Sequence, residues 1–530
     1  MHETTTVAAI MRWTALAGAA ALAAGAGTQA AGSPMAGTNS VRQLSLQECV
    51  VEALQFNLDV QIERYNPVIG RRSLSIAYAD YDPTFRSTVQ HNFDRDPGGV
   101  DAQGRPFVGR ETDGETISAG LNGLLPSGMT YNIGTAAGNT RFNNQSIGAL
   151  SESSFANWTI GELRQPLLRN SWIDGTRYNI RAGKIGLRQD ELTLRYRVLT
   201  TVAAVEQAYY DLVATIENVR NAEKSVELAD RLYRENQKRV QVGALAPLDE
   251  KESASQLASS RADLISAQTA VQAAENRLKT LITDKFEFWL GMTIRPTERL
   301  AALPEAFDVQ TSWDRSLALR PDLQSQQLQI ELQRLNIRYQ RNQLFPQLDV
   351  FGQMAYSGSG QEFNNPLGQG TIGGGEFSDA YRQVWRGDAP SYAVGGSLSF
   401  PLSNRRAREN FAIAKDSAEQ AELRFRAYRQ QVLLDVDNAI KAAVSAFERI
   451  GATQEARSFA EDALSAEEKK YQNGKSTSFL VLQAQQRLTS ARLAELRALT
   501  DYNKALATLR ASEGTTLERF SLDLGQIPSL

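Results

Sequence analysis

Hydrophobic positions along most of the chain recur with a helical period. Residues 187–242 contain neither glycine nor proline. At 1.5 Å per residue, these roughly 56 residues would form a helix about 84 Å long. Their apolar residues step by three and four, as at Val202, Val205 and Tyr209, which predicts one narrow apolar face. Residues 248–290, 402–450 and 475–513 are similarly uninterrupted. Helices several times the usual length of about 11–12 residues indicate a coiled coil or a helical tube.

Shorter segments alternate with a period of two, which predicts β-strands. Phe85, Val89 and Phe93 are the clearest apolar positions of one strand, and 348–356 and 392–400 alternate in the same way. A membrane barrel and a soluble sandwich both give this pattern. Another hairpin is predicted over 117–133, around the Pro-Ser-Gly at 126–128, although the sequence does not place it. Residues 94–114 and 357–390 are rich in Gly, Asn and Asp and predict exposed loops.

A separate helix is predicted before the first strand. Ser45 and Glu48 have the spacing of a capping box, so the helix should begin there. It should end near Pro83, because a residue that precedes proline avoids the helical conformation. Pro67 and Gly70 lie inside the segment and should kink or interrupt it.

The chain repeats itself. A shift that carries Leu54 onto Leu317 also carries Asp59 onto Asp322 and Pro83 onto Pro346. A second shift, smaller by about 32 residues, pairs residues 177–278 with 408–509 and holds its register over about a hundred residues. The first copy must therefore contain about 32 extra residues between 83 and 177.

These patterns predict a mostly α chain built from two copies of a helix–strand–strand–long helical hairpin unit. We expect a first repeat at 44–290, a linker at 291–312, a second repeat at 313–513 and a C-terminal segment at 514–530. Residues 1–30 are typical of a signal peptide, with Arg12 followed by a short Gly/Ala-rich run; a membrane anchor would be longer and richer in Leu. Later segments lack the ~18 consecutive apolar residues of a membrane helix, so any membrane-spanning part should be made of strands.

Composition argues against several kinds of chemistry. The formal charge is −3 and the charges are interspersed, so a nucleic-acid partner is not expected. Cys49 is the only cysteine, predicted as a small buried residue of a helix, and His2 and His91 are the only histidines. These counts leave no basis for a His-rich metal site or a Ser-His-Asp triad. We predict no catalytic, cofactor-binding or metal site, and hence no enzyme.

Short motifs then give a family resemblance. Residues 316–323, Ser-Leu-Ala-Leu-Arg-Pro-Asp-Leu, resemble the A-L-x-x-R-P-D-L segment of the TolC family of outer-membrane efflux proteins, with Ser316 in the alanine's place. Residues 165–168 and 400–402 resemble that family's strand-to-helix junctions. The order, duplication and spacing of the elements are similar to that family across nearly all of the mature chain.

The resemblance implies a trimeric α/β-barrel channel-tunnel, with a β-barrel in the lipid of the outer membrane and a helical tunnel through the periplasm. It would serve a tripartite efflux or type I secretion system. Cargo would pass through it passively, from a periplasmic adaptor (membrane fusion) protein and an inner-membrane transporter to the exterior. The cargo itself stays open between drugs, metal ions and polypeptides.

The same resemblance suggests functional residues at the helical turns. Gly243 and Gly474 stand where the family's V-G turn meets the adaptor, although glycine also simply ends helices. Tyr471 fits the tyrosine of the family's aperture pattern, whose two later aspartates are replaced here by Leu480 and Gln483.

Acidic residues occupy the corresponding positions of the first repeat. Asp249 and Glu252 are therefore the candidate aperture acids. The alternative is that they are ordinary acids of a first helical turn, favoured by the helix dipole.

Three other functions fit the sequence less well than a channel. A periplasmic coiled-coil adaptor is the main alternative, but it would lack two duplicated helical hairpins with strands between them. An enzyme would need paired carboxylates such as Asp435 and Asp437, which lie on a long helix where solvated charge is the simpler explanation. A single-chain porin would need many more strands.

Overall fold

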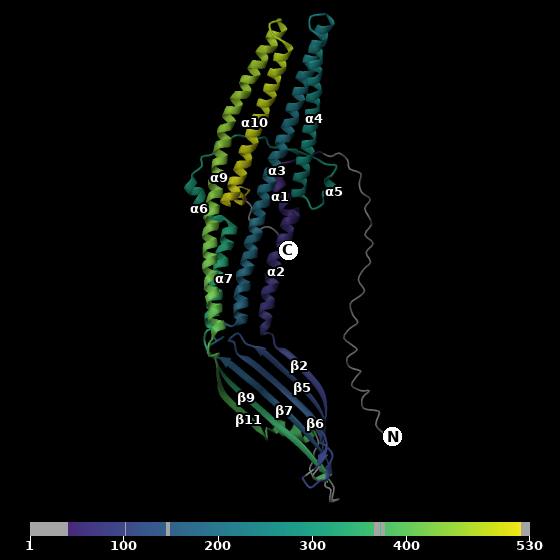
Figure 1. The fold of residues 1–530 in the computed structure, drawn as a ribbon, viewed down its shortest axis with the longest axis vertical. Helices are drawn as coiled ribbons and strands as arrows, with labels where there is room; N and C mark the ends of the chain where they lie inside the picture. The colour runs from purple at the N-terminus through teal and green to yellow at the C-terminus, as the bar shows by residue number, and fades with distance from the viewer. Residues whose placement is uncertain (1–40, 101, 145–148, 365–370, 373–376, 521–530) are drawn as a thin grey trace, which may run out of the picture.

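The computed structural model describes residues 41–100, 102–144, 149–364, 371–372 and 377–520. The predicted signal peptide and the end of the C-terminal segment lie outside the described residues. The molecule is elongated, with paired helices at one end and a twisted sheet at the other (Figure 1). The repeat boundaries expected from the sequence stay predictions, although the two copies of the unit run side by side along this length.

Two long helical hairpins are the largest elements of the molecule. The first consists of α3 (Gly175–Gln241) and α4 (Pro247–Ile282), and the second of α9 (Arg405–Gln472) and α10 (Ser478–Glu513). Helices α3 and α9 have 67 and 68 residues, while α4 and α10 have 36 each, so the duplication is close to symmetrical here. The four predicted helices are present, with some bounds changed. Helix α4 ends at Ile282 and a short helix α5 (Phe286–Trp289) follows, α9 continues through Gly451 to Gln472, and α10 begins at Ser478.

The helices form a layer that is four helices wide. Beside the sheet the order is α2 (Leu58–Tyr78), α3, α7 (Pro321–Asn342) and α9, and toward the far tips it is α4, α3, α10 and α9. The narrow apolar face predicted on α3 is buried, with Val202, Val205 and Tyr209 fully inaccessible. Among the described residues, no helix combines the length and the apolar character that a membrane-crossing helix needs.

The first helical segment corrects one expectation. The Ser45–Glu48 capping box is present and starts α1 (Leu46–Phe56). Pro67 and Gly70 do not interrupt the segment, since α2 continues through both while it packs along α3; a kink at these positions stays a prediction. The chain breaks at Asn57 instead, whose side chain accepts a hydrogen bond from the Val60 amide at 3.1 Å and caps α2. The second repeat has the same break at Arg320, between α6 (Val309–Leu319) and α7.

Small elements close the middle of the molecule around the apolar core. Strand β1 (Val41–Leu44) pairs in parallel with β8 (Thr293–Pro296), and α11 (Thr516–Arg519) packs on α3. Cys49 is fully buried in this core, as predicted, and burial raises the pKa of its thiol to about 12. The helical period of the sequence therefore leads to a single packed layer with its largest core near mid-length.

The sheet is antiparallel and contains six long strands among the described residues. Their order in space is β2, β5, β6, β7, β9 and β11. These strands are β2 (Thr84–Arg95), β5 (Glu111–Leu124), β6 (Thr130–Asn144), β7 (Ala149–Pro166), β9 (Gln347–Asn364) and β11 (Pro390–Ser399). The hairpin that the sequence did not place is β5–β6, and it lies between β2 and β7.

The loop expected at 357–390 was partly wrong. Strand β9 runs on to Asn364. Its second half is rich in Gly and Ser, a composition typical of loops, but it forms a strand because it pairs with β7. A short strand β10 (Thr371–Ile372) and a helix α8 (Phe377–Arg386) also fall in this range. In the loop expected at 94–114, the described residues between β2 and β5 form only the short pair β3 (Gly99–Val100) and β4 (Pro106–Phe107).

Candidate functional site at the helical tips

Both helical hairpins reverse through the same backbone motif. Gly243 and Gly474 have φ angles of 74° and 69°, in the left-handed region. The amide of the next residue bonds back to the carbonyl five positions earlier, Ala244 to Arg239 at 2.7 Å and Lys475 to Lys470 at 2.8 Å. This is the Schellman ending of a helix, which favours glycine because it lacks a Cβ.

The surroundings of these turns are open. A Cβ built on either glycine would meet nothing within 4 Å. Val242, which precedes the first turn, is 79% exposed. The two turns therefore require glycine for their backbone shape and not for space, and they present exposed side chains at the end of the molecule.

Below the turns, one polar network joins the two hairpins. The Tyr471 hydroxyl of α9 donates to the Asn236 side chain of α3, and the Arg239 guanidinium lies 4.2 Å from the centre of the Tyr471 ring. Arg239 also donates to the Tyr471 carbonyl at 3.2 Å. Tyr471 is only 3% exposed, and this burial raises the pKa of its hydroxyl. The network holds the hairpins together within one chain.

The candidate aperture acids differ in their surroundings. The Asp249 carboxylate accepts a hydrogen bond from the Ser478 hydroxyl at 2.6 Å, which ties the start of α4 to the start of α10. Its backbone carbonyl also accepts a bond from Asn236 at 3.4 Å, so Asp249 and Tyr471 share one network. Glu252 lies apart from them on the exposed surface of α4.

The assignment of an aperture to Asp249, Glu252 and Tyr471 stays a prediction. Two of its members are brought together at the interface between the hairpins. The partners Asn236, Arg239 and Ser478 were missed, because they are ordinary helix residues and the contact between Asn236 and Tyr471 spans 235 positions. The only sequence signal was the position of Arg239 in the last turn before Gly243, which equally suits a helix dipole.

The Arg-Pro-Asp motif has a structural explanation of its own. Arg320 donates to both carboxylate oxygens of Asp322, at 3.1 and 2.6 Å, and the Tyr428 hydroxyl of α9 donates to the same carboxylate at 2.6 Å. Pro321 takes the first position of α7, where its missing amide hydrogen costs nothing. Burial opposes ionisation of Asp322, but the bonds from Arg320 and Tyr428 outweigh it and lower its pKa. The motif thus starts α7 and, through the Asp322–Tyr428 hydrogen bond, holds α7 against α9.

Comparison with known proteins gives one consistent result. The family described as outer membrane efflux protein matches residues 136–283 and 313–515. The pyoverdine export outer membrane protein OpmQ of Pseudomonas aeruginosa is 24% identical over 397 residues, which cover 66% of this chain and 76% of OpmQ.

Solved structures agree with the fold. The outer-membrane channel OprN gives a TM-score of 0.64 at 16% identity, over 89% of this chain and 90% of OprN. The CmeC outer membrane channel of Campylobacter jejuni gives 0.62 at 16% identity, over 91% and 90%. These likenesses confirm the predicted fold class, a helical tunnel joined to a strand portion.

Proposed function

This chain belongs to the outer membrane efflux protein family, and on that premise we propose that it is the trimeric outer-membrane channel of an export system. Cargo would pass through it passively from a periplasmic adaptor and an inner-membrane transporter to the exterior. Membership confirms the TolC-type resemblance drawn from the sequence and favours a channel over a periplasmic adaptor. It also makes an enzymatic role unnecessary.

The proposal of an oligomer rests on the two open edges of the sheet. In the described residues β2 pairs only with β5, and β11 pairs only with β9. Unpaired backbone groups cost several kcal/mol each in lipid, so a spanning sheet must close on itself. The six long strands alternate in direction, so β11 of one copy runs antiparallel to β2 of the next. Copies of the chain can therefore close a barrel without breaking the antiparallel pattern.

The helical layer supports the same assembly. It is four helices wide at both ends, so three copies supply twelve helices to a closed wall. A trimer is the state that the family resemblance implies.

The tips support the proposal of an adaptor partner. Two exposed Schellman turns per chain, at Gly243 and Gly474, give a trimer six similar turns in a ring. Such repetition suits a partner that binds in several copies. OpmQ is named for pyoverdine export, and for this chain the cargo stays unassigned.

The oligomer is tested on the purified full-length protein. We expect light scattering in detergent to give the mass of three chains, and reconstitution in a planar bilayer to give ion conductance. A folded, monodisperse monomer would overturn the proposal. So would a trimer that never conducts, even after the Tyr471–Asn236 contact is removed by Tyr471→Phe.

A further inference from the structure

Among the residues that the structure describes, the hairpin β5–β6 has no counterpart in the second repeat. The second repeat supplies two long strands, β9 and β11, whereas the first supplies β2, β5, β6 and β7. The extra residues that the two repeat shifts place between 83 and 177 correspond to this hairpin. We infer that β5–β6 is a wall segment that widens the channel mouth, giving the closed trimer eighteen strands where paired repeats would give twelve, and so admitting wider cargo. This inference rests on the proposed function.

The hairpin is in register with the strands that flank it. Leu121 of β5 lies opposite Phe85 of β2 on one side and Ile133 of β6 on the other. The Cα register carries this row through β7 to Met354 of β9 and Tyr392 of β11. Phe85, Leu121 and Ile133 are exposed large hydrophobic residues in the single chain. An apolar row that continues across all six strands is the pattern of a lipid-facing wall.

The neighbouring row, which points to the other face, has small and polar residues. Arg86 of β2 lies opposite Gly120, Gly120 opposite Gly134, and Gly134 opposite Thr159 of β7. The row ends at Ala355 and Ser391. On this face the hairpin contributes glycines, so it lengthens the circumference without filling the lumen. A hairpin folded into the channel as a plug would instead need bulky side chains to pack inside.

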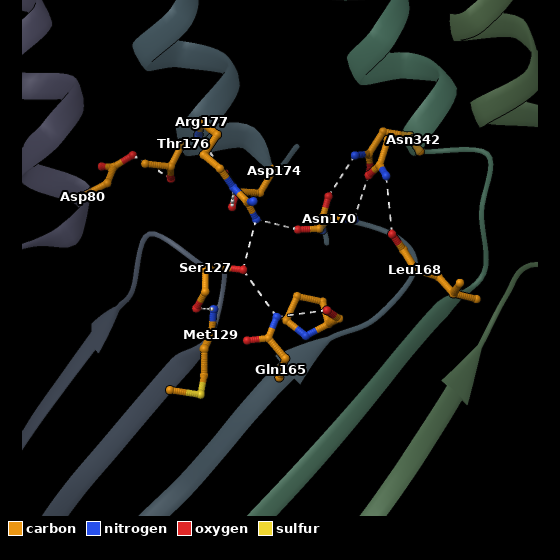
Figure 2. A network of polar contacts seen from close by, with 12 residues as sticks. Asp80, Ser127, Met129, Gln165, Leu168, Asn170, Asp174, Thr176, Arg177 and Asn342 are labelled. Carbon is orange, nitrogen blue, oxygen red and sulfur yellow. Dashed lines mark hydrogen bonds and ion pairs between the residues drawn. The ribbon is translucent and has the colours of Figure 1, made fainter. Parts of the chain in front are cut away.

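The periplasmic turn of the hairpin is built into the junction between sheet and helices (Figure 2). The Ser127 carbonyl accepts bonds from Arg177 of α3 and from Gln165 of β7, both at 3.3 Å. Arg177 is itself held by Asp174 at 2.8 Å and donates to the Asn170 carbonyl at 3.0 Å. The second repeat keeps an arginine at the matching position 408, but the part of that repeat that the structure describes has no such turn for it to hold.

The strand number sets the width of the mouth. With strands about 4.8 Å apart and tilted by about 40°, eighteen strands close at a backbone diameter of roughly 36 Å, and twelve at roughly 24 Å. Twelve helices spaced at about 9 Å close at roughly 35 Å. Eighteen strands therefore match the helical wall, and the lumen keeps its width across the junction. After a side-chain layer of about 5 Å is subtracted on each side, the clear widths are roughly 26 Å and 14 Å.

Two measurements test the inference. Electron cryomicroscopy of the wild-type trimer should show eighteen strands. In the second, Thr159→Cys places a thiol on the lumen face, while the native Cys49 is buried and silent. Maleimide-polyethylene glycols of graded size are added from outside to cells that carry this variant. The same variant with residues 111–144 deleted, which removes β5 and β6, should exclude polymers sized between the two clear widths. A matched deletion of 98–107, in the β3–β4 segment, should keep the parental size limit.

The outcomes separate this inference from the proposed function. A small maleimide must label all three proteins, which shows that each is folded and open to the outside. Equal size limits with and without 111–144, or twelve strands in the wild-type trimer, would overturn the wider mouth while leaving a trimeric channel intact. Loss of the trimer in the wild type would instead refute the proposed function. If the deletion variant does not reach the membrane, the strand count of the wild type decides alone.

Discussion

Replacing Gly474 tests the assignment of the helical turns to partner docking. Its φ of 69° lies in the left-handed region, and a Cβ would meet no atom within 4 Å. The cost of Gly474→Val is therefore conformational, about 1–2 kcal/mol per copy for an L-residue in this region and more for a β-branched one. A cost of about 1.4 kcal/mol lowers the population of the native turn tenfold, and a trimer contains three copies of this turn.

The rest of the hairpin should tolerate this change. Helices α9 and α10 pack against each other along their length, including the cluster of Ala443, Ile450, Ala498 and Tyr502, which lies far from the turn. We therefore expect normal trimer levels in the outer membrane and impaired export. Asparagine adopts the left-handed conformation more readily than other L-residues, so Gly474→Asn is the matched control and should retain most export.

The assay compares strains whose own copy of the gene is deleted and replaced by each variant. The export phenotype is normalised to trimer in the outer membrane, measured by quantitative immunoblot. Wild-type export by Gly474→Val at equal trimer levels would show that the shape of this turn is not needed for docking. Equal impairment by the Asn and Val variants would mean that the side chain, and not the backbone, disturbs the partner.

Three further changes have definite expected outcomes. Asp322→Asn should lower the free energy of unfolding by about 3 kcal/mol near pH 7, because it leaves Arg320 buried without its charge partner. Since the pKa of Asp322 is lowered in the fold, thermal unfolding at graded pH should show this difference shrinking as the pH falls through that pKa; a constant difference would contradict the ion pair. The Asp249→Asn, Glu252→Gln double variant should reduce cation preference in bilayer conductance, most strongly in low salt. Unchanged selectivity would remove both acids from the aperture. Cys49 should resist thiol reagents at pH 8 until the protein unfolds, and rapid native labelling would contradict its burial.

Local signals in the sequence were enough to predict the helical hairpins and their turns. Long stretches without glycine or proline must be helical if they are regular at all, and Gly243 and Gly474 are where those stretches end. The break at Asn57 was missed, because a single asparagine is a weaker signal than Pro67. The repeat held better information: Asn57 aligns with Arg320, where the following proline marks a helix start.

Contacts between distant segments could not be predicted in the same way. The link between Asn236 and Tyr471 depends on how the tips of two separate helical hairpins align, and no local pattern encodes that alignment. The position of the extra hairpin was equally hidden, since alternation identifies strands but not their neighbours. Its register with β2 and β7 depends on the pairing of all four strands in one sheet.

The two ends of the molecule have diverged to different extents for a physical reason. The helical hairpins of the two repeats match almost residue for residue in length. In the proposed channel, removing or adding a turn in one hairpin would shift its tip away from the tip of the other. A sheet can change more freely, provided that it changes by whole hairpins. Each added hairpin supplies backbone hydrogen-bond donors and acceptors along both of its edges. Because it adds an even number of strands, every pair of neighbouring strands stays antiparallel. Under the proposed function, a duplicated channel can therefore alter the width of its outer mouth while its helical end keeps its geometry.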